Sequence, residues 1–315
     1  MTHRAGISGA GRVPAQPEIE LPLGEYITGV QERINHGIEG YLEGVDPDFK
    51  DMFEHALGGN APKRLRPALA YITGDTLGVP RENIDELALV VELIHSASLA
   101  MDDLPGQDNS SLRRGQEAHH ERFGVGQTEV TTIAMLAEAG RIAVSADANN
   151  NLGGRLASHV MELVGARGMS LGQLRDISSA GQPAEEVSEE ELDEINWLKT
   201  GTAVEMSATG ATLIANPPDA DEIIRLLKVY SYHMGIAHQV QDDLWDGTKT
   251  AEEIGKPIGI DVRNNKPTYL SVLGLEGARE KASRHGQAAL TTLDDLPQRY
   301  NPVKLREIAG FIIGQ

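Results

Sequence analysis

Two clusters of aspartates are the residues whose types and spacing most directly indicate chemistry. They read Asp102-Asp103-Leu-Pro-Gly-Gln-Asp108 and Asp242-Asp243-Leu-Trp-Asp246. Carboxylates this close together repel one another unless cations neutralise them. Their hard oxygens suit Mg²⁺, which keeps several waters and commonly takes its remaining ligands from phosphate oxygens. The two clusters therefore predict magnesium ions held against a diphosphate group.

The first cluster needs an irregular backbone to act as one site. On an ideal helix, Asp102 and Asp108 would lie roughly 240° apart and could not share a metal ion. Pro105 and Gly106 stand between them, and both favour a distorted turn that can bring the later carboxylate back. We therefore expect an apolar helix to end at this cluster and a turn to fold Asp108 towards Asp102.

Two arginines follow the first cluster closely. A helix that ends in a solvated acidic loop, with Arg113 and Arg114 as simple ion-pair partners, is one interpretation. The same two guanidinium groups are also what a diphosphate needs, because each can bind phosphate oxygens through two parallel hydrogen bonds. The arginines therefore favour an anion-binding site.

The second cluster is expected on a regular helix. Asp242 and Asp246 are four residues apart and share a helix face, with Asp243 about 100° round the axis. The segment before them is apolar, so the acidic end would emerge from a buried helix. Basic residues follow this cluster too: Lys249, Lys256, Arg263 and Lys266. Two such clusters are most simply explained by metal-bridged diphosphate binding between facing helices.

Apolar residues recur with helical spacing along most of the chain. The clearest sets are Tyr26, Ile27, Val30, Ile34, Ile38 and Tyr41, then Leu87, Val90, Val91, Ile94 and Leu99, and then Ile223, Leu226, Leu227 and Tyr230. Glycine- and proline-rich breakers separate them, and strand-like alternation is rare. In the acidic run 185–194, Ser188 and Glu191 fit a capping box, which favours a helix start over a metal site. We predict an all-α fold, with a flexible tail over residues 1–20 and a single helical domain over residues 21–315.

The composition supports this prediction and argues against several classes of protein. Aromatic residues make up 4% of the 315 residues, which suits helix packing better than a β-sandwich. The formal net charge of −19 argues against nucleic-acid binding, because phosphate backbones are captured by basic surfaces. The chain has no cysteine, which excludes disulfides and thiolate chemistry. Without a membrane-spanning apolar run or a signal-peptide core, a cytoplasmic protein is expected.

Taken together, the motifs resemble those of the trans-isoprenyl diphosphate synthases, the polyprenyl synthetase family that includes farnesyl and geranylgeranyl diphosphate synthases. They follow the family's order from about Tyr26 to the C-terminus. They are Gly58-Gly59, Lys63-Arg64-Leu65-Arg66-Pro67, Glu92-Leu-Ile-His95, the first aspartate cluster with Leu112-Arg113-Arg114-Gly115, Phe123-Gly124, Gly172-Gln173 with Asp176, Lys199-Thr200-Gly201, Gln239-Val-Gln-Asp242-Asp243-Leu-Trp-Asp246, and Gly255-Lys256-Pro257 with Asp261 and Lys266. Each motif is weak alone, but the ordered set is specific.

This resemblance implies an isoprenoid-synthase-type helical bundle around a central apolar cavity, usually assembled as a homodimer. It also implies a prenyltransferase that condenses isopentenyl diphosphate with an allylic diphosphate by Mg²⁺-assisted ionisation. Breaking the allylic C–O bond leaves a carbocation and a diphosphate, so metals and cationic side chains stabilise the leaving charge. An apolar cavity keeps water from quenching the cation.

The family's residue roles carry over to the matching positions of this sequence. The resemblance implies that Asp102 and Asp108 ligate two Mg²⁺ ions and Asp242 a third. The catalytic set would be Asp102, Asp103, Lys199, Asp242 and Asp243. The residues around the allylic diphosphate would be Arg113, Lys199, Thr200, Gln239 and Lys256. Those that hold isopentenyl diphosphate would be Lys63, Arg66, His95 and Arg114.

In this family, residues one helical turn before the first cluster limit the length of the product. Ala97 and Ser98 occupy these positions here and both are small, which favours a twenty-carbon product, with fifteen carbons as the alternative. Several positions depart from the family pattern: Met101, Ser110, Ser111, Trp245 and the insertion Asn60-Ala61-Pro62 before Lys63. The insertion affects the register of Lys63, and the other departures affect the pocket walls.

Two alternative functions are also compatible with the resemblance. A class I terpene cyclase-like enzyme would keep the aspartate clusters but ionise one prenyl diphosphate without condensation. A non-catalytic partner subunit of a prenyl synthase would not need the carboxylates. The six aspartates, together with the basic residues assigned to isopentenyl diphosphate, favour a chain-elongating enzyme over both alternatives.

Overall fold

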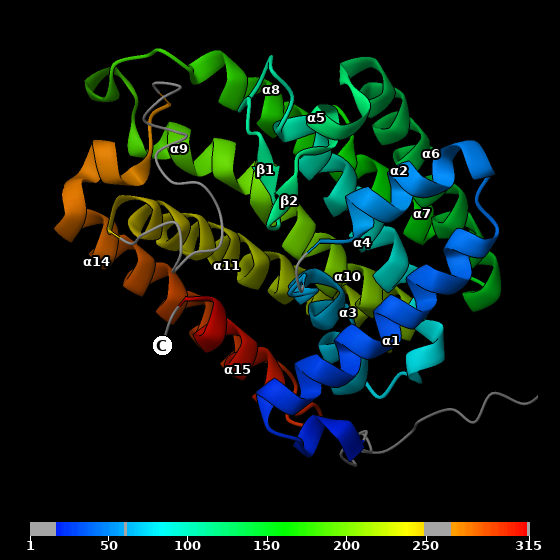
Figure 1. Ribbon diagram of the computed structural model, residues 1–315. Helices are drawn as coiled ribbons and strands as arrows, with labels where there is room; N and C mark the ends of the chain where they lie inside the picture. The colour runs from blue at the N-terminus through cyan, green and yellow to red at the C-terminus, as the bar shows by residue number, and fades with distance from the viewer. Residues whose placement is uncertain (1–16, 60–61, 249–265, 314–315) are drawn as a thin grey trace, which may run out of the picture.

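The computed structural model describes residues 17–59, 62–248 and 266–313, which form the bundle of helices in Figure 1. The α-helices are α1 (Leu23–Glu43), α2 (Pro47–Leu57), α3 (Leu65–Thr76), α4 (Asp85–Asp102), α5 (His119–Phe123), α6 (Val125–Asn150), α7 (Arg155–Val164), α8 (Met169–Ser179), α9 (Glu189–Asn196), α10 (Thr202–Ala215), α11 (Ala220–Thr248), α14 (Tyr269–Thr292) and α15 (Val303–Ile312). The shorter elements are the 3-10 helices η1 (Pro17–Glu20), η2 (Arg81–Asn83), η3 (Ala184–Glu186) and η5 (Leu293–Asp295), the π-helix η4 (Trp197–Gly201), and the strands β1 (Leu112–Arg113) and β2 (Gln116–Glu117).

The all-α prediction is confirmed, with one small exception. Strands β1 and β2 form an antiparallel hairpin that pairs Leu112 with Glu117 and Arg113 with Gln116. Residues 1–16 of the predicted tail lie outside the described residues, whereas the next four form η1, in which Ile19 is buried. Across the described helices, none combines the length and hydropathy required to cross a membrane.

Helix starts follow local hydrogen bonding. In α9 the Ser188 hydroxyl accepts from the Glu191 N–H at 3.1 Å, and the Glu191 carboxylate accepts from the Ser188 N–H at 3.4 Å. The capping box expected in the acidic run is therefore confirmed. Thr268 forms a similar reciprocal pair with Ser271 at the start of α14. This second cap fixes the helix that begins beside the second aspartate cluster.

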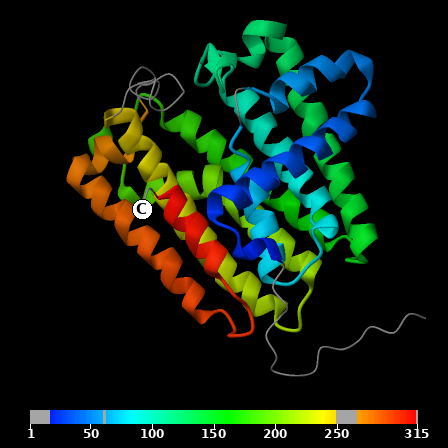
Figure 2. The same ribbon diagram turned by 60° about the horizontal axis from the view of Figure 1, so that its bottom comes forward.

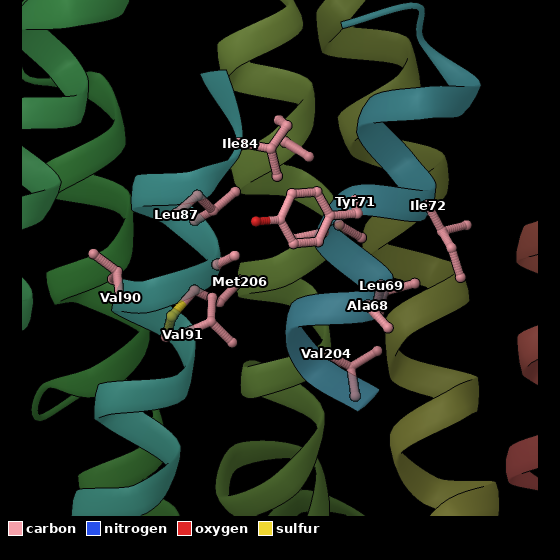
Figure 3. Close-up of a cluster of buried hydrophobic side chains, with 14 of the residues drawn as sticks. Ala68, Leu69, Tyr71, Ile72, Ile84, Leu87, Val90, Val91, Val204 and Met206 are labelled. Carbon is pink, nitrogen blue, oxygen red and sulfur yellow. The ribbon is translucent and has the colours of Figure 1, made fainter. Parts of the chain in front are cut away.

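The main core lies around α10, which is buried from Thr202 to Ile214 and has no solvent-facing side. Figure 3 shows side chains of α3, α4 and α10 meeting in this core, with Tyr71 pointing towards Leu87. A second apolar cluster joins α9, α11 and α14 and contains Val187, Leu192, Ile236, Val240, Leu244, Tyr269, Ala278 and Ala282. The apolar sets predicted in α1, α4 and α11 lie largely in these cores.

Helices α14 and α15 pack against α11, as Figures 1 and 2 show from two directions. The hydroxyl of Tyr230 on α11 donates to the carbonyl of Leu305 on α15 at 2.9 Å. The long helix α11 therefore has its apolar middle enclosed, while its C-terminal end carries the second aspartate cluster. The start of α14 returns to this same end, which places two helix termini beside the cluster.

Candidate active site

A cavity of about 710 Å³ is lined by residues from the C-terminal ends of α4 and α11 and from α6, α8 and η4. The predicted site residues that line it are Arg66, His95, Ala97, Ser98, Asp102, Asp108, Arg113, Arg114, Lys199, Thr200, Gln239, Asp242 and Asp243. Aliphatic residues line it as well, among them Ile94, Leu136, Val164 and Leu174. The cavity thus combines a charged region with an apolar wall.

The remaining candidates are placed differently. Lys63 is exposed and does not line the cavity, whereas its neighbour Arg64 is buried in left-handed backbone, with φ of 50°. Asp103 is also buried, but its side chain is not part of the cavity lining. Asp246 is likewise outside the lining, and Lys256 lies outside the described residues.

The backbone of the first cluster leaves the helix and returns to it. Helix α4 ends at Asp102, and the N–H of Asp108 donates to the carbonyl of Asp102 at 2.9 Å. The turn through Pro105 therefore brings Asp108 back to the helix end, as the sequence predicted. Burial raises the pKa of Asp102 to about 6; Lys199 opposes this rise and the nearby Asp108 adds to it. Burial therefore makes Asp102 harder to ionise than an exposed aspartate, and a further cation beside it would favour its charged form.

Asp103 is held by Arg113 instead of facing the cavity. The Arg113 Nε lies 3.1 and 3.0 Å from the two carboxylate oxygens of Asp103, and Nη2 also donates to Oδ1. Burial raises the pKa of Asp103, and Arg113 opposes that rise. The pair ties the hairpin β1–β2 to the end of α4. Arg113 is therefore a cavity residue whose guanidinium is already engaged.

Asp243 is also tied to the scaffold. Its Oδ1 accepts from Gln239 Nε2 at 2.9 Å, and its Oδ2 accepts from the backbone N–H of Tyr269 at 2.8 Å. Because Tyr269 is the first residue of α14, the carboxylate satisfies a helix-terminal amide and complements the helix dipole. The Thr200 hydroxyl donates to Gln239 Oε1 at 3.4 Å. Asp243 thus connects α11, α14 and η4.

Asp176 on α8 and Lys266 before α14 were not in the predicted set, yet both line the cavity. Asp176 Oδ2 lies 2.7 Å from both Lys199 Nζ and Lys266 Nζ. Lys266 Nζ also lies 2.6 Å from Asp108 Oδ1. Burial raises the pKa of Asp176, but the two lysines outweigh it and hold that pKa below its usual value. Both residues belong to motifs visible in the sequence, so their motif order was a usable signal.

Close contacts at glycine residues bring η4, which carries Lys199, into the cavity wall. A Cβ added to Gly235 of α11 would lie 2.5 Å from the Cα of Gly201, so these two helices touch backbone to backbone. A Cβ added to Gly172 of α8 would lie 2.3 Å from the backbone nitrogen of Lys199. The lack of side chains at these positions therefore lets α8, η4 and α11 converge around Lys199 and Thr200.

A second group of polar side chains contains Arg66, His95 and Arg114. Arg66 Nη1 lies 3.1 Å from His95 Nε2, and Arg114 Nη2 lies 3.3 Å from the buried Glu92. Burial, followed by the charges of Arg66 and Arg114, holds the pKa of His95 well below its usual value. His95 is therefore neutral at pH 7. Two guanidinium groups beside a neutral imidazole suit an anionic group with several oxygens.

The donor chemistry fits Mg²⁺ ions shared with a substrate. Within the described ranges of the chain, no three Asp, Glu, His or Cys side chains lie close enough to form an all-protein metal site. Mg²⁺ usually binds through one or two carboxylates and takes its other ligands from water and phosphates. Asp102 and Asp108 lie together, and Asp242 lines the same cavity from α11. These carboxylates fit ions completed by a diphosphate.

This bundle of helices, with aspartates of two helices at one cavity, has the all-α fold of the isoprenoid synthases. The family model described as polyprenyl synthetase matches residues 46–297. The chain therefore belongs to the polyprenyl synthetase family.

Individual relatives agree with this assignment. The chain is 35% identical over 297 residues to a farnesyl diphosphate synthase of Haemophilus influenzae, covering 92% of this chain and 97% of that protein. It is 32% identical over 257 residues to geranylgeranyl pyrophosphate synthase 4 of Arabidopsis thaliana, covering 81% and 68%. The structure of a geranyltransferase from Helicobacter pylori, complexed with magnesium and isoprenyl diphosphate, matches with a TM-score of 0.78 at 25% identity, covering 96% and 98%.

Proposed function

We propose that this chain is a Mg²⁺-dependent trans-prenyltransferase that condenses isopentenyl diphosphate with an allylic diphosphate. One observation carries the proposal: a single cavity is lined by two distinct groups of side chains whose charges suit a diphosphate. One group surrounds the carboxylates of Asp102, Asp108 and Asp242, and the other contains Arg66, His95 and Arg114. Condensation needs two diphosphate subsites beside an apolar space, whereas ionisation of one substrate needs a single subsite.

The first group would hold the allylic substrate. Asp102 and Asp108 would bind two Mg²⁺ ions and Asp242 a third, and these ions would neutralise the diphosphate as its C–O bond breaks. Lys199 supplies a fixed positive charge: burial lowers its pKa, but Asp102 and Asp176 outweigh burial and keep it protonated. The electron pair of the broken bond goes to the diphosphate, whose developing charge these groups stabilise.

Thr200 and Gln239 would orient the allylic diphosphate beside the metals. Their side chains are hydrogen-bonded to each other, and Gln239 is held in turn by Asp243. Arg113 would act mainly by fixing Asp103 and the hairpin, since its guanidinium is engaged there. For Lys256, which lies outside the described residues, the proposal that it binds the allylic diphosphate rests on the family resemblance alone.

The second group would hold isopentenyl diphosphate. Arg66 and Arg114 supply charge, and neutral His95 supplies a hydrogen bond without adding to their mutual repulsion. The double bond of isopentenyl diphosphate then attacks the allylic cation, and the adduct loses a proton to the released diphosphate, which restores a double bond. Lys63, which is exposed, retains this role only through its motif.

We propose a twenty-carbon product, with fifteen carbons as the alternative. Ala97 and Ser98 line the cavity from α4, and Ala97 is buried. Their small side chains leave room for a growing chain along the wall formed with Leu136 and Val164. Ala97→Phe should therefore shorten the product by five carbons or more, measured by chromatography of the dephosphorylated prenyl alcohols. A product of unchanged length would contradict this assignment.

We also propose that the protein is a homodimer. Val130, Ile133 and Val144 of α6 are 55%, 65% and 60% exposed, respectively, and Ala137 lies between them on the same helix face. An exposed apolar row on a long helix is a typical protein interface. Ile133→Asp should yield monomers in analytical ultracentrifugation. A wild-type protein that sediments as a monomer would contradict the proposal.

The decisive experiment is a product assay with purified protein. It combines Mg²⁺ and isopentenyl diphosphate with an allylic diphosphate of five, ten or fifteen carbons. We expect chain elongation that requires both substrates and stops when the metal is chelated. Cyclic hydrocarbon made without isopentenyl diphosphate would indicate the cyclase-like alternative. No turnover in any combination would indicate a non-catalytic partner subunit.

A further inference from the structure

Lys266 connects two carboxylates that have different roles in the proposed site. Its ammonium contacts Asp108, a proposed metal ligand, and also Asp176, which is not one. The Lys266 side chain is 6% exposed, and those of Asp108 and Asp176 are 16% and 17% exposed. Charges this well shielded from water interact strongly. The contact between Lys266 and Asp108 therefore bears on how that carboxylate can bind a metal ion.

We propose that Lys266 and a divalent cation compete for Asp108, so that metal binding transfers the Lys266 ammonium from Asp108 to the diphosphate. This inference rests on the proposed function, because it takes Asp108 as a magnesium ligand. A Mg²⁺ ion sits 2.0–2.1 Å from a carboxylate oxygen. Lys266 Nζ lies 2.6 Å from Oδ1 of the same carboxylate. A metal ion and an ammonium bound to the same carboxylate repel each other, so each weakens the binding of the other.

Asp176 keeps the displaced ammonium in the site. It contacts Lys266 and Lys199 through the same oxygen, so it holds two positive charges beside the first cluster. Burial and the nearby Lys199 lower the pKa of Lys266, but Asp176 and Asp108 outweigh them, so the lysine remains protonated. When Lys266 loses Asp108 it is still anchored by Asp176. Asp176 is thus a positioning residue that acts through the two lysines.

The exchange links metal binding to diphosphate binding. Metal at the first cluster removes one partner of Lys266, and a diphosphate can supply the replacement. By thermodynamic linkage, the diphosphate must strengthen metal binding by the same factor by which metal strengthens diphosphate binding. The lysine would also neutralise Asp108 whenever metal is scarce, which lowers the repulsion from Asp102.

A labelling experiment on the wild-type protein tests the exchange directly. Acetic anhydride modifies accessible amines, and mass spectrometry of peptides measures the extent at Lys266, with the exposed Lys50 as an internal reference. We expect slow modification of Lys266 without added metal. Mg²⁺ alone should accelerate it severalfold, and Mg²⁺ with inorganic diphosphate should suppress it again. A Lys266 rate that does not respond to Mg²⁺ would overturn the proposal.

A binding experiment tests the competition. Lys266→Met removes the competing charge, so calorimetric titration with Mn²⁺ alone should show about tenfold tighter binding at the first cluster. Lys50→Met changes the formal charge equally at an exposed position and should leave the affinity unaltered, while Lys266→Arg should stay near wild type. Unchanged or weaker binding in Lys266→Met would reject the competition.

The two proposals can fail separately. A wild-type protein that elongates prenyl chains, but whose Lys266 neither responds to Mg²⁺ nor affects Mn²⁺ binding, would reject the exchange alone. A protein that binds metal as expected but never condenses the two substrates would reject the proposed function. Circular dichroism and thermal unfolding verify that Lys266→Met is folded, and the labelling experiment needs no variant.

Discussion

In the first aspartate cluster the backbone leaves the helix and folds back, whereas in the second it continues as helix α11 from Ala220 to Thr248. The carboxylates are nevertheless divided in the same way. Asp102, Asp242 and Asp243 line the cavity and Asp103 does not, but the second aspartate of each pair is the one hydrogen-bonded to the scaffold, Asp103 to Arg113 and Asp243 to Gln239 and Tyr269. Two unlike backbones thus each place a cavity-lining carboxylate directly before a carboxylate that is hydrogen-bonded to the scaffold.

The partners of the two structural carboxylates differ. Asp103 pairs with a charged side chain, Arg113, which belongs to the hairpin. Asp243 accepts hydrogen bonds from uncharged groups, the Gln239 amide and the N–H of Tyr269. The comparison indicates that adjacent aspartates in these motifs combine two tasks. The first places a negative charge at the cavity, and the second fixes a neighbouring element, the hairpin in one case and the start of α14 in the other.

The largest expected effects come from the first aspartate of each pair, Asp102 and Asp242. Asp102→Ala and Asp242→Ala should each lower kcat/KM at least about a thousandfold, because each removes a proposed ligand of the metal ions that would neutralise the leaving diphosphate. Steady-state kinetics at saturating Mg²⁺ measures this loss. Asp246→Ala is the matched control, since Asp246 does not line the cavity, and its loss should stay below about tenfold. Equal losses in Asp102→Ala, Asp242→Ala and Asp246→Ala would contradict the proposed difference between the first two aspartates, which line the cavity, and Asp246.

Smaller effects are expected from the scaffold-bound members. Asp103→Asn and Asp243→Asn should lower kcat by roughly ten- to a hundredfold, the usual range for residues that orient the groups around a metal. Metal stoichiometry measured by calorimetry should be preserved in both variants. If either variant lost a metal ion, that aspartate would have to be reassigned as a ligand.

The stability of the metal-depleted protein offers a third test. Asp102 has a folded pKa of about 6 against an ordinary value of 3.8, so its ionisation opposes folding. This loss of stability begins as the pH rises past about 4 and is complete above about 6. In EDTA at pH 7, Asp102→Asn should therefore raise the free energy of unfolding by about 3 kcal/mol. Denaturant titrations at pH 4 and pH 7 measure it, and the gain should vanish at the lower pH.

The smallest effect is expected at the turn of the first cluster. Gly106 has no left-handed φ, and an added Cβ would meet nothing within 4 Å. Gly106→Ala should change the free energy of unfolding by less than about 1 kcal/mol, with stabilisation through the less flexible unfolded chain. Activity should remain within a few fold of wild type. A large loss would show that the turn needs glycine after all.

Much of this arrangement could be predicted from the sequence because it depends on local patterns. Helical periodicity predicted the buried faces, and Pro105 predicted the turn that returns Asp108 to Asp102. The capping box at Ser188 needed only its own residues. The order of the motifs indicated the family, and the structure places most of the named residues around one cavity.

The parts that could not be predicted depend on contacts between distant segments. The division between Asp102 and Asp103 depends on the hairpin that carries Arg113, and the position of Asp243 depends on where α14 begins. The motif order indicated Asp176, but its contact with both lysines depends on the approach of α8 to η4 at Gly172, which no spacing along the chain reveals. Lys63 follows an insertion and is exposed, while Arg64 takes the buried position.

The π-helix η4 determines how this enzyme would respond to the deletion of a residue from its polypeptide. A π-turn has the form of an α-helix with one additional residue, and such turns often occur at functional sites. Deleting one residue between Trp197 and Gly201 would remove the additional residue and restore a regular helix, with the turns on either side keeping nearly their present rotation. The buried face of α10 would then still point towards the core, but the widened turn from which Lys199 reaches Asp176 would be lost. A single-residue deletion in η4 should therefore preserve folding while lowering activity.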